Sequence, residues 1–324
     1  MTMSTKLVAA GIACFLPSLT LAQTYPDRAV TLVVPYNPGG ATDMVARLVA
    51  EALTKELGQP VVVENRAGAA SQIGNAYVAN SRPDGYTLLF GTADGLAVLP
   101  AISQSLPYSP LDSYEQIGLI SEVPFTYTVS ATFPADNFQG FVEYAKENPE
   151  SVIYGSAGQG TTSHIFTELM AAETGIQMTH VPYTGTGPVI ADMLGGNVDL
   201  TTATPAAVEQ YQRTDNLKVL AVASANRHTL LPDVPTTAEL GYPAIEAASW
   251  FGLLAPKGTP AEITSRLEDA LAAIAQGSSD LQERVEKIGA TLNYQDPSSF
   301  RSLIESDIAR FSDVAQRAGI ELKQ

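Results

Sequence analysis

The segment spanning residues 30–57 limits most strongly what this chain can fold into. Residues 30–34 form a β-prone run, residues 35–40 form a loop rich in Pro and Gly, and an apolar pattern at helical spacing follows. Strand, tight loop and helix in this order are typical of a βα unit. Because Gly39 and Gly40 carry no side chains, a ligand can approach the free N–H groups at the positive end of the helix dipole. We therefore predict an anion site here that needs no Lys or Arg.

Short apolar runs alternate with amphipathic stretches along most of the chain. Predicted strands cover residues 30–34, 61–63, 87–90, 152–154, 179–181, 198–201 and 219–223. Predicted helices cover residues 42–57, 72–80, 138–147, 163–174, 188–195, 206–213, 260–275, 280–289 and 297–318. The alternation predicts an α/β fold with largely parallel sheets.

Two long β-prone passages interrupt this alternation, at residues 117–130 and 250–256. Passages so far apart in the chain suit a polypeptide that crosses twice between two α/β domains. We predict that residues 23–123 plus 251–324 form the first domain and residues 124–250 the second. A cleft between two such domains is a common ligand site, and closure about the crossovers is the expected motion.

The N-terminus has the features of a secretory signal peptide. Lys6 precedes an apolar stretch, and Thr20-Leu21-Ala22 supplies small residues for cleavage, so residues 1–22 are predicted to be removed. Cys14, the only cysteine, lies inside this segment and resembles a lipid-attachment site only loosely. We favour ordinary cleavage, which predicts a periplasmic protein without a thiol or a disulfide.

The composition restricts the possible partners. The 324 residues include 34 acidic and 18 basic side chains, for a formal net charge of -16. Nucleic acid and anionic membrane surfaces are therefore poor partners. An anionic small ligand would have to be captured by local dipoles rather than by the overall field.

Two further glycine-rich loops follow predicted strands, at residues 154–164 and 180–188. Their Ser and Thr hydroxyls and the free N–H groups of the following helices can donate to a carboxylate. In open α/β sheets ligands bind at the carboxyl ends of the strands. Such loops also occur as ordinary βα turns. Three of them meeting at one cleft favour a binding site.

Other chemistry has little support in the sequence. His164 and Glu168 have a spacing that can bind metal, but three His residues and no Cys beyond the signal make a full ligand set improbable. Ser156 with His164 or His180 lacks a nucleophile elbow and an assignable third residue. The Gly185-x-Gly187 pair is an incomplete dinucleotide signature. We predict no metal, no cofactor and no enzymatic activity.

Several motifs, in order along the chain, resemble one family. They are 25–28 (YPDR), 34–43 (VPYNPGGATD) with Ala46-Arg47, 63–69 (VENRAGA), 83–88 (PDGYTL), 154–164 (YGS to His164), 181–183 (VPY), 195–199 (GGNVD), and 231–236 (LPDVPT) with Glu239 and Gly241. Together they resemble the periplasmic solute receptors of tripartite tricarboxylate transporters, often called Bug proteins. The resemblance spans nearly the whole predicted mature chain.

This resemblance implies a two-domain periplasmic-binding-protein fold, also called a Venus flytrap, with a ligand cleft between the domains. By carry-over, the residues expected to bind the ligand are Tyr36, Pro38, Gly39, Gly40, Ala41, Thr42, Asp43, Thr92, Ser156, Gly158, Thr161, Thr162, Tyr183, Thr184, Gly185 and Thr204. Tyr36 stands where the family often has Phe. The Tyr side chain adds a hydroxyl, and this departure leaves the ligand's identity open.

The implied function is the capture of a small mono- or dicarboxylate, aliphatic or aromatic (terephthalate, for example), for membrane permease subunits. We expect the receptor to act as a monomer. Two alternatives remain open on the sequence alone. A sensory receptor that feeds a membrane signalling partner would use the same pocket, and an exported α/β hydrolase would need a catalytic triad.

Overall fold

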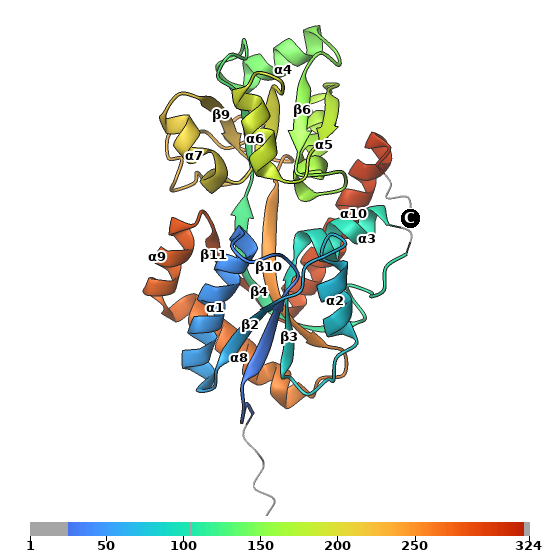
Figure 1. The fold of residues 1–324 in the computed structure, drawn as a ribbon, viewed down its shortest axis with the longest axis vertical. Helices are drawn as coiled ribbons and strands as arrows, with labels where there is room; N and C mark the ends of the chain where they lie inside the picture. Colours follow the sequence, from blue (N-terminus) through green and yellow to red (C-terminus); the bar gives the residue numbers. More distant parts are fainter. Residues whose placement is uncertain (1–24, 104, 321–324) are drawn as a thin grey trace, which may run out of the picture.

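Two lobes, each built on its own β-sheet, make up the structure, a computed structural model that describes residues 25–103 and 105–320. Lobe 1 holds the six-stranded sheet and lobe 2 the five-stranded sheet (Figure 1). The predicted signal peptide 1–22 and Cys14 lie outside the described residues. Among the described residues, no helix is both long and apolar enough to cross a bilayer.

The sheet of lobe 1 has the strand order β11-β4-β10-β3-β1-β2. Its strands are β1 (Val30–Val34), β2 (Val61–Asn65), β3 (Thr87–Thr92), β4 (Tyr114–Pro124), β10 (Ala248–Pro256) and β11 (Thr291–Gln295). β1 pairs in parallel with β2 and β3, whereas β10 runs antiparallel to β3 and β4. Ala248, Ser249 and Trp250 already pair with β4 and so belong to this sheet.

Helices cover both faces of the lobe 1 sheet. They are α1 (Ala41–Leu57), α2 (Gln72–Ala79), a π-helical turn η1 (Asp94–Val98), α3 (Leu99–Ile102), α8 (Ala261–Gly277), α9 (Ser279–Lys287) and α10 (Pro297–Ala318). Because side chains alternate along a strand, Leu32 packs with α1, α8 and α9, whereas Val33 packs with α2, η1 and α10. The alternation explains why β1 is apolar at nearly every position.

The sheet of lobe 2 has the order β7-β6-β8-β5-β9. Its strands are β5 (Thr126–Ser130), β6 (Ile153–Ser156), β7 (Thr179–Pro182), β8 (Leu200–Ala203) and β9 (Leu217–Val222). Its helices are α4 (Phe138–Glu147), α5 (Thr162–Thr174), α6 (Thr186–Leu194) and α7 (Pro205–Arg213). The strands and helices predicted from the sequence are confirmed, with ends shifted by a few residues. The sequence did not predict η1, α3 or β11.

The chain passes between the lobes at two adjacent points. Phe125 leaves lobe 1 directly after β4, and Ala247 returns directly before β10. The Phe125 N–H donates to the Ala247 carbonyl at 2.8 Å, and the Ala247 N–H donates to the Ala223 carbonyl at 3.0 Å. The two crossing segments are therefore hydrogen-bonded to each other, so they are held as one connection.

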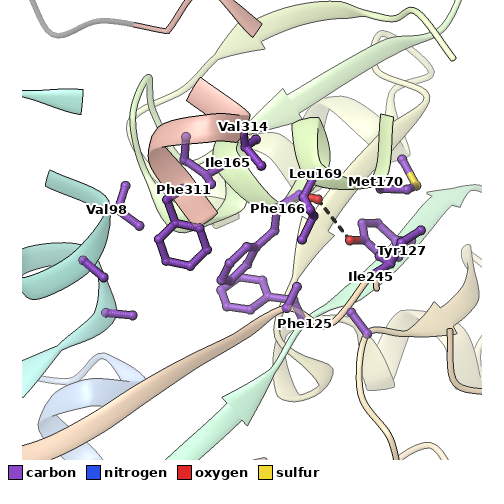
Figure 2. Close-up of a cluster of buried hydrophobic side chains, with 14 of the residues drawn as sticks. Val98, Phe125, Tyr127, Ile165, Phe166, Leu169, Met170, Ile245, Phe311 and Val314 are labelled. Atoms are coloured by element: carbon purple, nitrogen blue, oxygen red, sulfur yellow. Dashed lines mark hydrogen bonds between the residues drawn. The ribbon is translucent and has the colours of Figure 1, made fainter. Parts of the chain in front are cut away.

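An apolar cluster joins the lobes beside these crossings (Figure 2). Val98 of η1 and Phe311 of α10 belong to the same buried cluster as Phe125 and Phe166 of α5. The Phe166 ring centroid lies 5.1 Å from that of Phe125 and 5.6 Å from that of Phe311. The C-terminal helix of lobe 1 therefore packs directly on lobe 2.

Removing one ring from this cluster should be costly. Phe311 is fully buried, so Phe311→Ala should lower the free energy of unfolding by about 3–5 kcal/mol through lost burial and a cavity. Urea denaturation measures the change. Leu194→Ala is the control, because Leu194 is 47% exposed and its truncation should change stability by less than about 0.5 kcal/mol. Similar losses in the two variants would contradict the role of Phe311.

Candidate functional site

The loop between β1 and α1 leaves a helix start open. Gly40 is the N-cap of α1 in extended conformation, with no side-chain hydrogen bond to the first turn. Gly39 has φ +90°, which favours glycine. A Cβ added at Gly39 or Gly40 would meet no atom within 4 Å. The backbone of this loop therefore borders open space, as an anion site requires.

The side chain of Asp43 fixes the conformation of this loop through hydrogen bonds. Its buried carboxylate accepts hydrogen bonds from the Gly39 N–H, from Arg47 Nε and from Asn65 Nδ2, each at 2.9 Å. Burial alone would raise the pKa of Asp43, but the bonds from Arg47, Gly39 and Asn65 lower it overall. The Gly39 N–H is thus used within the loop, and Asp43 has its charge satisfied by the protein.

Tyr36 connects the same loop to the end of β3. Its hydroxyl lies 3.3 Å from Thr92 Oγ1 and donates to Asp94 Oδ2 at 2.9 Å. Burial and the nearby Asp94 charge raise the pKa of Tyr36 well above its ordinary value, so the hydroxyl stays a donor. The hydroxyl of Tyr36 therefore contacts Thr92, also predicted from the sequence, and Asp94, which the sequence analysis missed.

Asp94 begins the π-helical turn η1. Such turns are rare and often occur at functional sites. The turn packs closely on Ser71 and Asn75: a Cβ on Gly95 would lie 2.5 Å from Ser71 Oγ and 2.2 Å from Asn75 Nδ2. Ala69, Ala70 and Ser71 all have positive φ, a strained backbone for residues other than glycine. The region around Asp94 is thus built at a conformational cost.

Asp94 also reaches the other lobe. Its Oδ1 accepts a hydrogen bond at 3.0 Å from the N–H of Thr162, the first residue of α5. The N-cap residue, Thr161, makes no side-chain capping bond. A carboxylate from lobe 1 therefore satisfies the N-terminus of a lobe 2 helix, and three predicted residues (Tyr36, Thr92 and Thr162) are brought together around it.

The loop between β6 and α5 uses its hydroxyls largely on itself. Ser156 Oγ and Thr161 Oγ1 both donate to the Gly158 carbonyl, at 3.0 and 2.8 Å. The Ala157 N–H donates to Ser163 Oγ at 2.9 Å. Ser156 and Thr161 therefore hold the loop in place, and its backbone is what remains for a ligand.

A stacked pair of histidines is hydrogen-bonded to the loop between β6 and α5. The rings of His164 and His180 lie 3.9 Å apart at an interplanar angle of 13°. His180 Nε2 is 2.7 Å from Ser156 Oγ, and His164 Nδ1 accepts from the Gly160 N–H at 3.1 Å. Burial and the neighbouring His180 lower the pKa of His164 to about 3, and burial lowers that of His180. Both rings are therefore neutral supports at pH 7.

The loops after β7 and β8 are more loosely connected to this group. The Tyr183 N–H donates to the Ser156 carbonyl at 3.0 Å, and its hydroxyl donates to Asp192 at 2.6 Å. Gly185 is the N-cap of α6 and Thr204 the N-cap of α7. Thr184 is exposed. These residues lie at the carboxyl ends of their strands, and no described contact joins Thr184, Gly185 or Thr204 to Asp94.

Catalytic and metal chemistry find little basis here. Within residues 25–103 and 105–320, no group of three His, Cys, Asp or Glu side chains is arranged to hold a metal ion. Nor does any carboxylate in that part of the chain hydrogen-bond to the ring of His164 or His180. The contact between Ser156 and His180 thus has no acid to orient it.

The chain matches the TctC family, described as the tripartite tricarboxylate transporter family receptor, over residues 45–320. It belongs to this family. The relative BugT of Bordetella pertussis is 37% identical over 303 residues, 93% of each chain. The match confirms the resemblance seen in the sequence, and the family consists of periplasmic solute-binding receptors rather than enzymes.

Solved structures of TctC-type proteins agree in fold. Rpa4515 of R. palustris with adipate is 37% identical with a TM-score of 0.80, covering 92% of this chain and 99% of that one. MatC of Rhodopseudomonas palustris with bound malate is 31% identical with a TM-score of 0.75, covering 90% and 99%. These likenesses confirm the predicted two-domain periplasmic-binding-protein fold.

The histidine pair predicts a specific pH dependence of the folding stability of this receptor. A buried His that stays neutral binds no proton between pH 6.5 and about 3, whereas the unfolded chain does, so stability falls as the pH drops through this window. His164 alone should contribute a slope of about 1.4 kcal/mol per pH unit. Urea denaturation between pH 8 and pH 5 measures it.

His164→Asn is the matched variant, because its amide oxygen can still accept from Gly160 and does not titrate. When the free energies of unfolding are normalised at pH 8, the curves of wild type and variant should diverge below about pH 6.5. The variant should lose less stability than the wild type as the pH falls. Superimposable curves would show that the neutral ring of His164 carries no such effect.

Proposed function

We propose that this receptor captures a small carboxylate between its two lobes in the periplasm and delivers it to membrane permease subunits of a tripartite tricarboxylate transporter. Membership of the TctC family supports this proposal, and relatives with bound adipate and malate support carboxylates as the ligand class. We further propose that it works as a monomer.

One observation in the site carries the proposal. The N-terminus of α5 already binds a carboxylate, that of Asp94, through the Thr162 N–H. The open N-terminus of α1 lies on the same loop as Tyr36, which is bonded to the same Asp94. Two helix starts, each with partial positive charge, therefore flank one region between the lobes.

The mechanism follows from the connection between the lobes. We propose that lobe 1, which includes β4 up to Pro124 and β10 from Ala248, moves as one body and lobe 2 as the other, pivoting at Phe125, Ala247 and the contact of α10 with α5. A ligand that contacts the start of α1 in lobe 1 and the loop before α5 in lobe 2 makes more contacts when the lobes are closed. It therefore shifts the population toward the closed form by its differential affinity.

A thermal-shift screen of the purified protein against aliphatic, amino and aromatic carboxylates tests this function. A binder at about 100 times its Kd should stabilise the folded state by about 2.7 kcal/mol, visible as a higher Tm. No shift with any acid, in protein refolded from denaturant to remove bound ligand, would refute carboxylate binding.

Gly40→Val should abolish carboxylate binding and leave the fold intact. Gly40 has φ -79°, which Val adopts without strain, and its added side chain enters open space over the backbone donors. Isothermal titration with the best acid of the screen should show at least a hundredfold weaker Kd. Gly277→Val is the control, because Gly277 is also open but lies at the end of α8. Wild-type affinity in folded Gly40→Val protein would remove this loop from the site.

A further inference from the structure

Asp94 has acceptor capacity that the protein does not use. One oxygen accepts from the Tyr36 hydroxyl and the other from the Thr162 N–H, and the Thr162 side chain also interacts with the carboxylate. A carboxylate offers about four lone-pair positions, so at least one of them remains free for a ligand. The residue is partly exposed.

No cation among the described residues balances this acid. Within the part of the chain that the structure describes, no Lys or Arg forms an ion pair with Asp94. Arg47, on the neighbouring helix α1, is bonded to Asp43 and Asn65. The contrast with Asp43 is direct: one acid of the site has its own guanidinium, and the other has only neutral donors. Burial accordingly raises the pKa of Asp94, and the bonds from Tyr36 and Thr162 offset only part of that effect.

The protein holds Asp94 in place at a cost. It starts a rare π-helical turn, it is followed by a glycine that allows Ser71 and Asn75 to approach, and the adjoining loop is left-handed at residues 69–71. None of the sixteen residues predicted to bind ligand is a Lys or an Arg. A second negative charge beside Asp94 would therefore meet like charge without compensation.

We infer that Asp94 binds an ammonium group of the ligand, so that this receptor takes a small carboxylate that also carries a protonated amine, an amino acid in the broad sense. The inference deepens the proposed function and depends on it. The ligand's carboxylate binds the backbone donors at the start of α1, and its ammonium group donates to the free lone pairs of Asp94. A dicarboxylate, the ligand class of the relatives with adipate and malate, is then disfavoured here.

Isothermal titration with matched pairs of acids tests the inference. The pairs are succinate with β-alanine, glutarate with 4-aminobutyrate and adipate with 5-aminopentanoate, which exchange a carboxylate for an ammonium group; the common α-amino acids are tested beside them. We expect the tightest ligand to be an amino carboxylate, with a Kd at least tenfold below that of every diacid. A diacid as the tightest ligand would overturn the inference and leave the proposed function standing. No binding of any acid would refute both.

Asp94→Asn then tests the residue itself. The amide oxygen can still accept from Thr162, so the fold should persist, which the urea midpoint checks. The variant should bind the amino carboxylate at least tenfold more weakly and lose most of the preference over the matched diacid. Asp136→Asn, which removes the same charge from an exposed site, should keep the wild-type preference. If Asp94→Asn kept the wild-type preference for the amino carboxylate, Asp94 would be excluded as the cause of that preference. If the variant misfolds, the order of the Kd values measured with the wild-type protein decides the ligand class.

Discussion

The packing of α10 against α5 determines how the two lobes face each other. Phe311 and Phe166 meet in an apolar cluster that also contains Phe125, at the crossing point, and Val98, at the end of η1 (Figure 2). Because Val98 ends the turn that Asp94 begins, the cluster that joins the lobes also fixes where Asp94 points. The hydrogen bond from Thr162 to Asp94 therefore depends on apolar packing on the adjacent side of the same turn. Close-packed interiors transmit such constraints because they have few ways to deform.

The site has an uneven electrostatic design. Asp43 carries a charge that Arg47, Asn65 and a backbone N–H satisfy, so it acts as a fixed part of the loop. Asp94 carries a charge that, in the described part of the chain, meets neutral donors of Tyr36 and Thr162 and no cation. Helix N-termini favour anions, and the N-terminus of α5 already binds the carboxylate of Asp94. A ligand entering this region therefore meets both a positive helix end and an uncompensated acid, and its own charges must match both.

Much of the fold could be predicted from local sequence patterns, whereas the role of Asp94 in the candidate site could not. The alternation of apolar runs predicted nearly all strands and helices because each pattern depends on neighbours in the chain. Residues 94–102 were missed because Gly95 and Pro100 interrupt an apolar run without a clear helical period. Asp94 was missed because its partner Thr162 lies far along the chain. The strand-end rule applied to Thr92 also covers Asp94, two residues later, so a signal existed.

The hydroxyls of Ser156 and Thr161 were assigned to the ligand, but local bonds to Gly158 use them first, a competition typical of Ser and Thr.

The proposed recognition and the proposed closure would be linked through one hydrogen bond, that from Thr162 to Asp94. Thr162 is the first residue of the helix that carries Phe166, and Asp94 opens the turn that carries Val98, so the polar contact and the apolar contact join the same two elements. The apolar cluster changes little with the charge of a ligand. The contact of Asp94 with Thr162 responds directly, because a cation beside Asp94 keeps the acid ionised and strengthens its bond to the helix start. On the proposed model, a ligand with an ammonium group stabilises the contact of Asp94 with Thr162 as well as its own contact with Asp94. A second anion would instead compete with Asp94 for the Thr162 N–H. A ligand shifts a conformational equilibrium only by its differential affinity for the two states. The proposed role of Asp94 would therefore make the same acid set both the selectivity of the site and the extent of closure.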